Sequence, residues 1–296
     1  MEFKARFSKW TETVNTALES YIVLKDVPES IIYNAMKYSI SAGGKRLRPV
    51  LALAAGEMLG GDEKDTLPYA CAIEMIHTYS LIHDDLPAMD NDDFRRGKPT
   101  NHKVYGEAMA ILAGDALLNK AFELMLQYTL SRNDKLPERI KTMEIIARAS
   151  GTAGMIGGQV VDLEAEGRKI SGDRLEYMHK CKTGALLKAP VLAAAALCGA
   201  GTAETGSLEE YAGKIGLAFQ IKDDIMDVEG SLEDMGKASG SDAAKEKATF
   251  VSLYGIEKSK NMLKDTITGA VEALDAFGTK AFFLKELAYY IQSRKS

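Results

Sequence analysis

The amino-acid sequence predicts an all-α fold, and three observations carry this prediction. Long segments are rich in Ala, Leu, Met, Glu and Lys, which have high helix propensities. In several of these segments apolar residues recur at spacings of three and four, as they do on the buried face of a helix. The chain has only 7 prolines, and no segment is convincing as a strand.

We expect about ten helices, and proline and glycine residues indicate where they begin and end. The predicted helices cover residues 9–24, 28–42, 48–60, 66–86, 105–130, 137–157, 173–182, 184–200, 207–228 and 254–275. Pro28, Pro68 and Pro137 lie where a helix should begin or bend. Glycine pairs are expected in the connections, at Gly43-Gly44, Gly60-Gly61 and Gly157-Gly158. Because no linker or repeat divides the chain, we predict a single domain over residues 1–296.

Composition and charge exclude several classes of protein. The net charge of −5 argues against non-specific binding to nucleic acid or to an anionic membrane. The most apolar run, residues 186–201, contains Lys188 and Pro190 and is too short to span a bilayer. The 3 cysteines are too widely spaced for a disulfide framework or a zinc ribbon. We therefore expect a cytoplasmic protein that binds neither nucleic acid nor membrane.

The first cluster of aspartates consists of Asp84, Asp85 and Asp90, at the end of an apolar run. On a continuous helix Asp90 would lie off the face of Asp85, but Pro87 can interrupt the helix and redirect the chain. Carboxylates this close repel one another and need a positive partner. Mg²⁺ is such a partner, because it prefers one or two carboxylates together with water and phosphate oxygens.

The second cluster consists of Asp223, Asp224 and Asp227, which follow the apolar segment 215–221. Residues three and four apart share one side of a helix, so these carboxylates can converge on the same metal ions. A solvated acidic surface is the ordinary alternative, but the apolar flank favours a buried helix that opens at its tip. Two such clusters indicate an enzyme that holds a diphosphate through several Mg²⁺ ions.

Basic residues that could hold a diphosphate accompany both clusters. They occur as Gly-Gly-Lys-Arg-Leu-Arg at 43–48, Arg-Arg at 95–96 and Lys-Thr-Gly at 182–184, and as lysines at 222, 237 and 247. The planar fork of arginine and the point charge of lysine both suit phosphate oxygens, although each residue alone is an ordinary surface charge. His77 could donate to an anion or pack in the core, and Gln159 and Gln220 could direct dipoles at a cation.

Taken together, these motifs resemble those of the trans-isoprenyl diphosphate synthases, most closely the bacterial farnesyl diphosphate synthases. The resemblance covers nearly the whole chain and rests on the joint order of several motifs: residues 43–49, Asp84-Asp85-x4-Asp90 with Arg95-Arg96-Gly97, Gly157-Gly158-Gln159, Lys182-Thr183-Gly184, and Phe219-Gln220-Ile221-Lys222-Asp223-Asp224-x-x-Asp227. It implies an all-α isoprenoid synthase-type helical bundle around a deep central cavity that both aspartate motifs face. It also implies a homodimer.

The resemblance further implies a role for each candidate residue. Three Mg²⁺ ions would be held by Asp84, Asp85, Asp90, Asp223, Asp224 and Asp227. The allylic diphosphate would be contacted by Arg95, Lys182, Lys222 and Lys237, with Lys247 a weaker candidate. The diphosphate of isopentenyl diphosphate would be held by Lys45, Arg48, His77 and Arg96. Thr183 and Gln220 would line the allylic carbocation, and the catalytic set would be Asp84, Asp85, Lys182, Thr183, Gln220 and Asp223.

The implied reaction is the Mg²⁺-dependent head-to-tail condensation of isopentenyl diphosphate with dimethylallyl or geranyl diphosphate. Its chain length should depend on what closes the cavity beneath the first motif. Tyr79 and Ser80 lie about one helical turn before Asp84, and Met75 lies one turn further. We expect Tyr79 to stop the growing tail while Ser80 leaves room beside it, which predicts farnesyl diphosphate, the C15 product. The alternative is that Tyr79 is an ordinary core residue.

Three other activities stay open at this point. A geranylgeranyl diphosphate synthase is the nearest, because residues 91–93 and 98–102 also resemble that branch. A terpene cyclase would need an Asn/Asp-x3-Ser/Thr-x3-Glu motif in place of the second aspartate cluster. A non-catalytic subunit of a prenyl synthase should lack one aspartate motif, whereas this chain keeps both.

Overall fold

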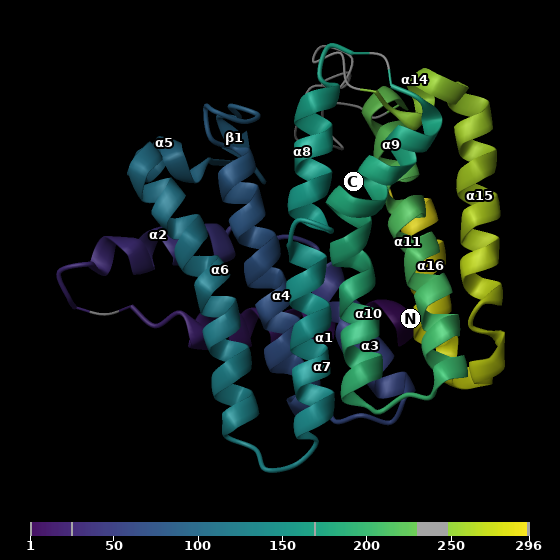
Figure 1. The fold of residues 1–296 in the computed structure, drawn as a ribbon, viewed down its shortest axis with the longest axis horizontal. Coiled ribbons are helices and arrows are strands. Elements are labelled where there is room, and N and C mark those ends of the chain that lie inside the picture. The colour runs from purple at the N-terminus through teal and green to yellow at the C-terminus, as the bar shows by residue number, and fades with distance from the viewer. Residues whose placement is uncertain (1, 25, 169, 230–247, 295–296) are drawn as a thin grey trace.

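The computed structural model describes residues 2–24, 26–168, 170–229 and 248–294, and within them the chain forms a helical bundle with one short hairpin (Figure 1). The all-α prediction is confirmed. The first half contains α1 (Glu2–Tyr21), α2 (Ser30–Ile40), α3 (Leu47–Met58), α4 (Glu63–Asp84), β1 (Phe94–Arg95), β2 (Lys98–Pro99), α5 (Asn101–Tyr105), α6 (Glu107–Leu130) and α7 (Leu136–Ser150). The second half contains α8 (Met155–Ala165), α9 (Gly172–His179), η1 (Lys180–Gly184), α10 (Ala185–Leu197), α11 (Thr202–Glu229), α14 (Phe250–Tyr254), α15 (Ile256–Glu272), η2 (Asp275–Ala281) and α16 (Phe282–Ser293).

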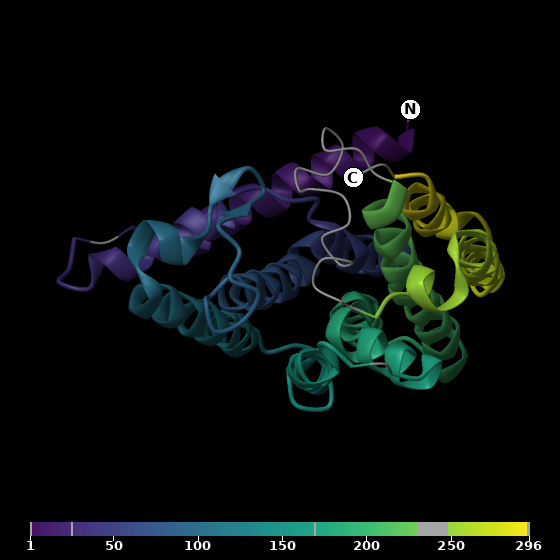
Figure 2. The same cartoon turned by 90° about the horizontal axis from the view of Figure 1, so that it is seen from above.

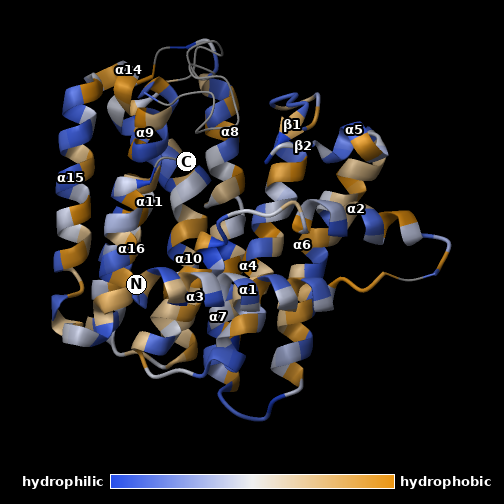
Figure 3. Ribbon diagram, turned by 180° about the vertical axis from the view of Figure 1, so that it is seen from behind, coloured by the Kyte–Doolittle hydropathy of each residue, from blue (hydrophilic) through white to orange (hydrophobic). Residues whose placement is uncertain are grey.

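The core is built around α3 and α10. Every residue of α3 except Arg48 and Glu57 is buried, and most of α10 is buried as well. A helix that is apolar on all sides is stable only when other helices surround it. In Figure 3 the outer helix α15 carries many polar residues, whereas α10 is largely apolar. Arg48, which is half-buried, is therefore one of the two places where α3 leaves the apolar core.

The C-terminal ends of α4 and α11 lie at the same end of the bundle, so both aspartate motifs lie there too (Figure 1). In the view from above (Figure 2), α1 lies along one side of the bundle, and α6 lies opposite α11, α15 and α16. None of the helices in the described part of the chain combines the length and apolarity needed to cross a membrane.

The predicted helix 137–157 is wrong, because the chain forms two helices there. The first of them, α7, ends at Ser150, and α8 begins at Met155. A Cβ atom on Gly154 would lie 2.2 Å from the carbonyl oxygen of Ala149, so only glycine fits this break. The glycine pair 157–158, which was expected in a connection, lies inside α8.

Helix boundaries at the two ends of the chain were also predicted wrongly. The structure has an additional helix, α16, and α1 begins at Glu2 rather than at residue 9. The two ends pack on each other, since the ring of Phe283 lies 4.9 Å from that of Phe3 and 4.7 Å from that of Trp10. These aromatic pairs join residues far apart in the sequence, so a local pattern could not predict them.

The hairpin of β1 and β2 was not expected from the sequence. Phe94 pairs with Pro99 and Arg95 with Lys98, in antiparallel register. Arg96 and Gly97 form the turn with φ angles of 53° and 73°, and two positive φ angles define the type I′ turn that suits a two-residue hairpin. The hairpin is too short for the alternating pattern that identifies strands in a sequence.

A buried ion pair fixes the start of α3. Arg46 donates to Glu74 of α4 at 2.8 Å, to Asn15 of α1 at 2.8 Å and to the carbonyl oxygen of Ile40 at 2.5 Å. The side chains of Arg46 and Glu74 are only 2% and 3% exposed. This arginine therefore joins α1, α2 and α4 at the base of the basic loop 43–46.

We predict that Glu74→Leu destabilises the protein by about 3–5 kcal/mol, because it leaves the Arg46 charge buried without its counterion. The free energy of unfolding in urea measures this effect. Glu209→Leu is the matched control, since Glu209 forms an ion pair with Lys188 at the surface. The control should cost less than about 1 kcal/mol. Equal losses in the two variants would contradict a special role for the buried pair.

Candidate functional site

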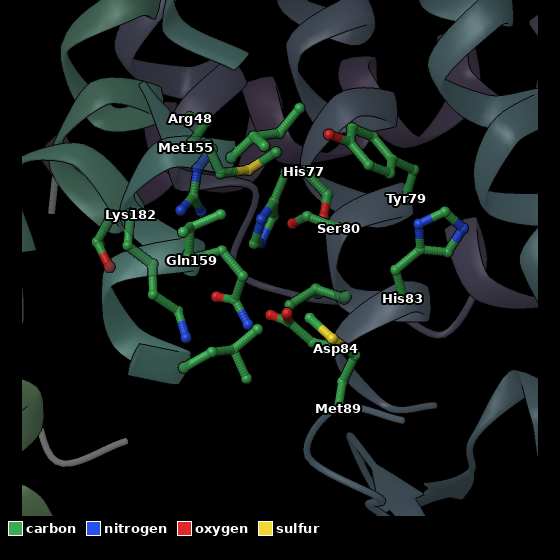
Figure 4. A pocket seen from close by; sticks show the side chains of 15 residues that line it. Arg48, His77, Tyr79, Ser80, His83, Asp84, Met89, Met155, Gln159 and Lys182 are labelled. Atoms are coloured by element: carbon green, nitrogen blue, oxygen red, sulfur yellow. The ribbon is translucent and has the colours of Figure 1, made fainter. Parts of the chain in front are cut away.

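A cavity of about 350 Å³ lies between α4, α8 and η1 (Figure 4). Its lining consists of Arg48, His77, Tyr79, Ser80, Leu81, His83, Asp84, Met89, Met155, Ile156, Gln159, Val160, Leu163, Lys182 and Thr183. In Figure 4 the side chains of Lys182, Gln159 and Asp84 approach one another across the cavity, while Tyr79 and His83 lie together at one side. The cavity thus combines a charged region with an apolar wall.

The aspartates of the first motif have different environments at the C-terminal end of α4. Asp85 is 3% exposed, and its two oxygens accept from Nε of Arg95 at 2.7 and 2.9 Å. Asp84 lines the cavity, and the backbone N–H of Asp90 donates to its carbonyl oxygen at 2.8 Å. Burial raises the pKa of Asp84. The negative charges of Asp90 and Asp85 also raise it, whereas the positive charge of Lys182 lowers it.

The basic loop 43–46 and the hairpin bring arginines to the same part of the site. The guanidinium of Arg96 donates to the carbonyl oxygen of Gly43, and a Cβ atom on Gly44 would lie 2.6 Å from that guanidinium. Gly44 has a φ angle of 126°, a conformation that favours glycine, and a side chain there would displace the guanidinium. Burial lowers the pKa of Arg48 to about 10, and among the described residues its Nε has no hydrogen-bond partner. Such an arginine is suited to binding an anion.

His77 lies beside these arginines and lines the cavity. Burial, followed by the positive charges of Arg48 and Arg96, holds the pKa of His77 well below its usual value. The imidazole is therefore neutral at pH 7 and has one N–H to donate.

Lys182 and Thr183 lie in the π-helical turn η1, which joins α9 to α10 without a break. The sequence had suggested a connection between helices at this point, and a π-turn inside a helix often marks a functional site. Gly158 of α8 packs on this turn, since a Cβ atom there would lie 2.1 Å from the amide nitrogen of Lys182. Nζ of Lys182 donates to Asp162 at 2.5 Å, one turn further along α8.

A chain of hydrogen bonds links Thr183 to the second aspartate motif. The hydroxyl of Thr183 donates to Oε1 of Gln220 at 3.1 Å, and Nε2 of Gln220 donates to Asp224 at 2.8 Å. The other oxygen of Asp224 accepts from the backbone N–H of Phe250 at 2.7 Å. The amide of Gln220 is thereby oriented with its oxygen toward Thr183.

Asp223 has a partner from the other end of the chain. Arg294, which caps α16, donates to Asp223 and, at 3.1 Å, to the carbonyl oxygen of Phe219. Its guanidinium carbon also lies 3.9 Å from the centre of the Phe219 ring. Burial raises the pKa of Asp223, whereas Arg294 and then Lys45 lower it. Arg294 thus supplies a positive charge beside the second aspartate motif.

Comparison with known proteins identifies the family. The profile of polyprenyl synthetase matches residues 29–278. The chain belongs to the polyprenyl synthetase family. A farnesyl diphosphate synthase from Geobacillus stearothermophilus is 48% identical over 281 residues, which cover 93% of this chain and 93% of the relative. A geranylgeranyl diphosphate synthase from Cyanophora paradoxa is 46% identical over 276 residues, covering 92% of this chain and 91% of that one.

Solved structures agree with this family. The crystal structure of an FPP/GFPP synthase from Zymomonas mobilis has a TM-score of 0.88 at 36% identity, covering 99% of both chains. The crystal structure of a geranyltransferase from Legionella pneumophila has a TM-score of 0.87 at 33% identity, covering 99% of this chain and 97% of that one. The isoprenoid synthase fold implied by the sequence motifs is confirmed.

Other candidate residues from the sequence analysis lie as follows. Ser80 lines the cavity, and its hydroxyl donates to the carbonyl oxygen of His77 at 2.8 Å. Met75 is fully buried in α4. Burial and then Arg294 lower the pKa of Lys222, which adjoins the second motif. Asp227 lies one turn beyond Asp223 in α11. Lys237 and Lys247 lie outside the described residues.

Two charged residues at the site, Asp162 and Arg294, were not among the candidates. Asp162 could have been found from its spacing, because it lies four residues after Gly158 and so on the same face of α8. Arg294 could not have been found in this way, since it is 71 residues from Asp223. Its position depends on how α16 packs.

The site has the donor chemistry that a hard divalent cation requires. Within the described residues, no three His, Cys, Asp or Glu side chains are gathered as a ready-made metal site. The carboxylate of Asp84, however, lies beside those of Asp85 and Asp90, and burial and these charges destabilise its anionic form. A divalent cation would relieve this repulsion, and oxygen donors are the ligands that Mg²⁺ prefers.

We predict that Arg294→Ala lowers the free energy of unfolding by about 1–2 kcal/mol, because Asp223 loses its cation. The figure is modest because the Asp223 side chain is 38% exposed. Urea unfolding measures the loss. The double variant Arg294→Ala with Asp223→Asn should recover part of it, since a neutral amide needs no cation.

Lys285→Ala is the control for this prediction, because Lys285 on the same helix pairs with Asp275 at the surface. It should change stability by less than about 1 kcal/mol. If Asp223→Asn restored nothing in the Arg294→Ala background, the destabilisation would not come from the unpaired carboxylate.

Proposed function

We propose that the protein is a Mg²⁺-dependent prenyltransferase that condenses isopentenyl diphosphate with dimethylallyl or geranyl diphosphate to give farnesyl diphosphate. One observation carries the proposal: the cavity has Asp84 and Lys182 in its charged region and Tyr79 in its wall. An allylic diphosphate also has a charged head and an apolar tail, so its two parts match the charged region and the wall of the cavity. Membership of the polyprenyl synthetase family and the Geobacillus stearothermophilus relative support the same activity.

The proposed binding roles follow the chemistry of the side chains. The carboxylates of Asp84, Asp85, Asp90, Asp223, Asp224 and Asp227 would hold three Mg²⁺ ions. When bound, these ions would neutralise the allylic diphosphate and make it a better leaving group. The same diphosphate would be contacted by Arg95, Lys182, Lys222, Lys237 and Lys247. Isopentenyl diphosphate would be held by Lys45, Arg48, Arg96 and His77. The first three would attract its diphosphate by their positive charge, and the neutral His77 would donate one N–H to it.

In the proposed reaction the C1–O bond breaks, a C–C bond forms and a C–H bond loses its proton, and side chains of the protein assist these steps. The C1–O bond of the allylic diphosphate breaks while Lys182 stabilises the charge on the leaving oxygens. The oxygens of Thr183 and Gln220, oriented by their mutual hydrogen bond, stabilise the allylic cation. The double bond of isopentenyl diphosphate attacks C1 and forms the new C–C bond. A proton from isopentenyl diphosphate then passes to the departing diphosphate, so no side chain is required as a general base.

Tyr79 is proposed to set the product length. It is 6% exposed and lines the cavity one helical turn before Asp84, while Met75 lies buried one turn further along α4. A tail that grows along α4 from a diphosphate at Asp84 would meet the Tyr79 ring first. Ser80, beside it, leaves room for the tail. This favours the C15 product.

Geranylgeranyl diphosphate synthase is the second candidate, and the Cyanophora paradoxa relative of that name favours it. The expectations of a cytoplasmic homodimer and of a single domain over residues 1–296 also remain part of the proposal. Exposed apolar side chains near both ends of α6 support the homodimer, since a partner subunit would cover them. These side chains are Ile111, Leu112, Leu126 and Leu130.

We predict that the protein, given isopentenyl diphosphate and an allylic primer, forms product with Mg²⁺ and none with a chelator present. Asp84→Ala should lower kcat by about 10²–10³-fold, because it removes a carboxylate that would hold the Mg²⁺ ions needed to stabilise the leaving diphosphate. Radiolabelled isopentenyl diphosphate and product chromatography measure both effects. Glu209→Ala, which changes an exposed carboxylate, is the control. Absence of product with every primer would overturn the assignment.

We predict that Tyr79→Ala shifts the main product from C15 to C20 or longer, because the cavity then extends by about one helical turn, or about 5 Å. Chromatography of the dephosphorylated products measures the chain length. Tyr289→Ala, an exposed tyrosine of α16, is the control and should leave the C15 product unchanged. An unchanged product from Tyr79→Ala would rule out its role in stopping the tail.

A further inference from the structure

Tyr79 packs against His83, one turn further along α4. The two rings meet edge to face, with centroids 5.6 Å apart and an interplanar angle of 80°. Figure 4 shows them together at one side of the cavity, away from Lys182. Such a contact stabilises one orientation of the phenol ring, because the edge of one ring is attracted to the face of the other.

His83 is itself held by α6. Its Nε2 lies 3.0 Å from the carbonyl oxygen of Ile111, a distance at which the imidazole N–H donates to that oxygen. Nε2 also lies 4.0 Å from the carboxylate of Asp115, one turn further along the same helix. These contacts direct the polar edge of the ring toward α6, and they explain a histidine next to the first aspartate motif that is not needed as a metal ligand.

Gly114 provides the space that this imidazole occupies. A Cβ atom at position 114 would lie 2.1 Å from Nε2 of His83 and 2.4 Å from its Cδ2. No side chain fits at these distances, so even alanine must push the ring away. Because the clash is with a side chain and not with the backbone of α4, the ring can move while the helices stay packed.

We propose that His83, held in the space left by Gly114, is a positioning residue that fixes Tyr79 and so sharpens the product length. This inference rests on the proposed function, in which Tyr79 stops the growing tail. A tail that reaches C15 presses on the phenol ring, and the ring resists only if a neighbour blocks its rotation. The contact from α6 through His83 supplies that resistance, so α6 determines specificity without touching the substrate.

The test compares products of Gly114→Ala, His83→Ala and His83→Gln with those of the unchanged protein. In Gly114→Ala and His83→Ala the ratio of C20 to C15 product should rise by a factor of about three to ten, which corresponds to the loss of one aromatic contact. His83→Gln keeps an N–H donor toward Ile111 but loses the ring, and should behave like His83→Ala. Gly206→Ala is the matched control, because its added Cβ would meet nothing within 4 Å, and it should leave the ratio unchanged.

A second measurement separates positioning of Tyr79 from a general structural effect. In the Tyr79→Ala background, Gly114→Ala should cause no further lengthening, because the ring that His83 positions is gone. Lengthening that adds to that of Tyr79→Ala would overturn the proposal. The proposal would also be overturned if all three single variants gave the same C20-to-C15 ratio as the unchanged protein. Thermal unfolding by circular dichroism identifies any variant that fails to fold, and the remaining variants then decide.

The outcomes also separate this inference from the proposed function. If the unchanged protein forms no condensation product, the proposed function fails. If Tyr79→Ala lengthens the product while Gly114→Ala and both His83 variants do not, the proposed function stands and only the positioning role of His83 fails.

Discussion

Negative charge beside an apolar cavity is the constraint on which the rest of this structure depends. Six aspartates lie in two motifs next to a core that extends to the cavity wall, and a carboxylate in such surroundings is unstable as an anion. Within the described part of the chain, individual groups offset the charge of three of these aspartates. Arg95 binds Asp85, Arg294 binds Asp223, and the backbone of Phe250 donates to Asp224. Each compensation also fixes the direction of a carboxylate.

The fold places the aspartates where negative charge is unfavourable and also brings cations to the same place. The first motif lies at the C-terminal end of α4, where the helix dipole disfavours negative charge and favours cations. The basic loop 43–46 and the hairpin bring cations to this end, and the Arg46–Glu74 pair anchors the loop below. The positive groups whose chemistry suits a diphosphate therefore also offset the charge of the aspartates.

Sequence patterns were enough to predict the fold class and to propose most of the candidate site, while contacts between distant segments were not predictable. Asp84 and Asp223 were found because their motifs are contiguous. Arg294 was missed because only the packing of α16 brings it to Asp223. The break between α7 and α8 was missed because the Gly154 conformation is decided by a single close approach to Ala149. The hairpin was missed because two-residue strands have no readable periodicity.

In the proposed function, one helix, α4, carries both the charged end of the substrate site and its apolar limit. Because α4 is rigid and rises about 1.5 Å per residue, the five positions from Tyr79 to Asp84 fix a rise of about 7.5 Å between these two residues along the helix. A rigid spacing is useful only if the ring that ends it is also rigid. Tyr79 has two rotatable bonds, so α4 alone cannot hold it. The contact through His83 to α6 supplies the missing restraint. On this proposal, product length is a property of how two helices pack and not of one side chain.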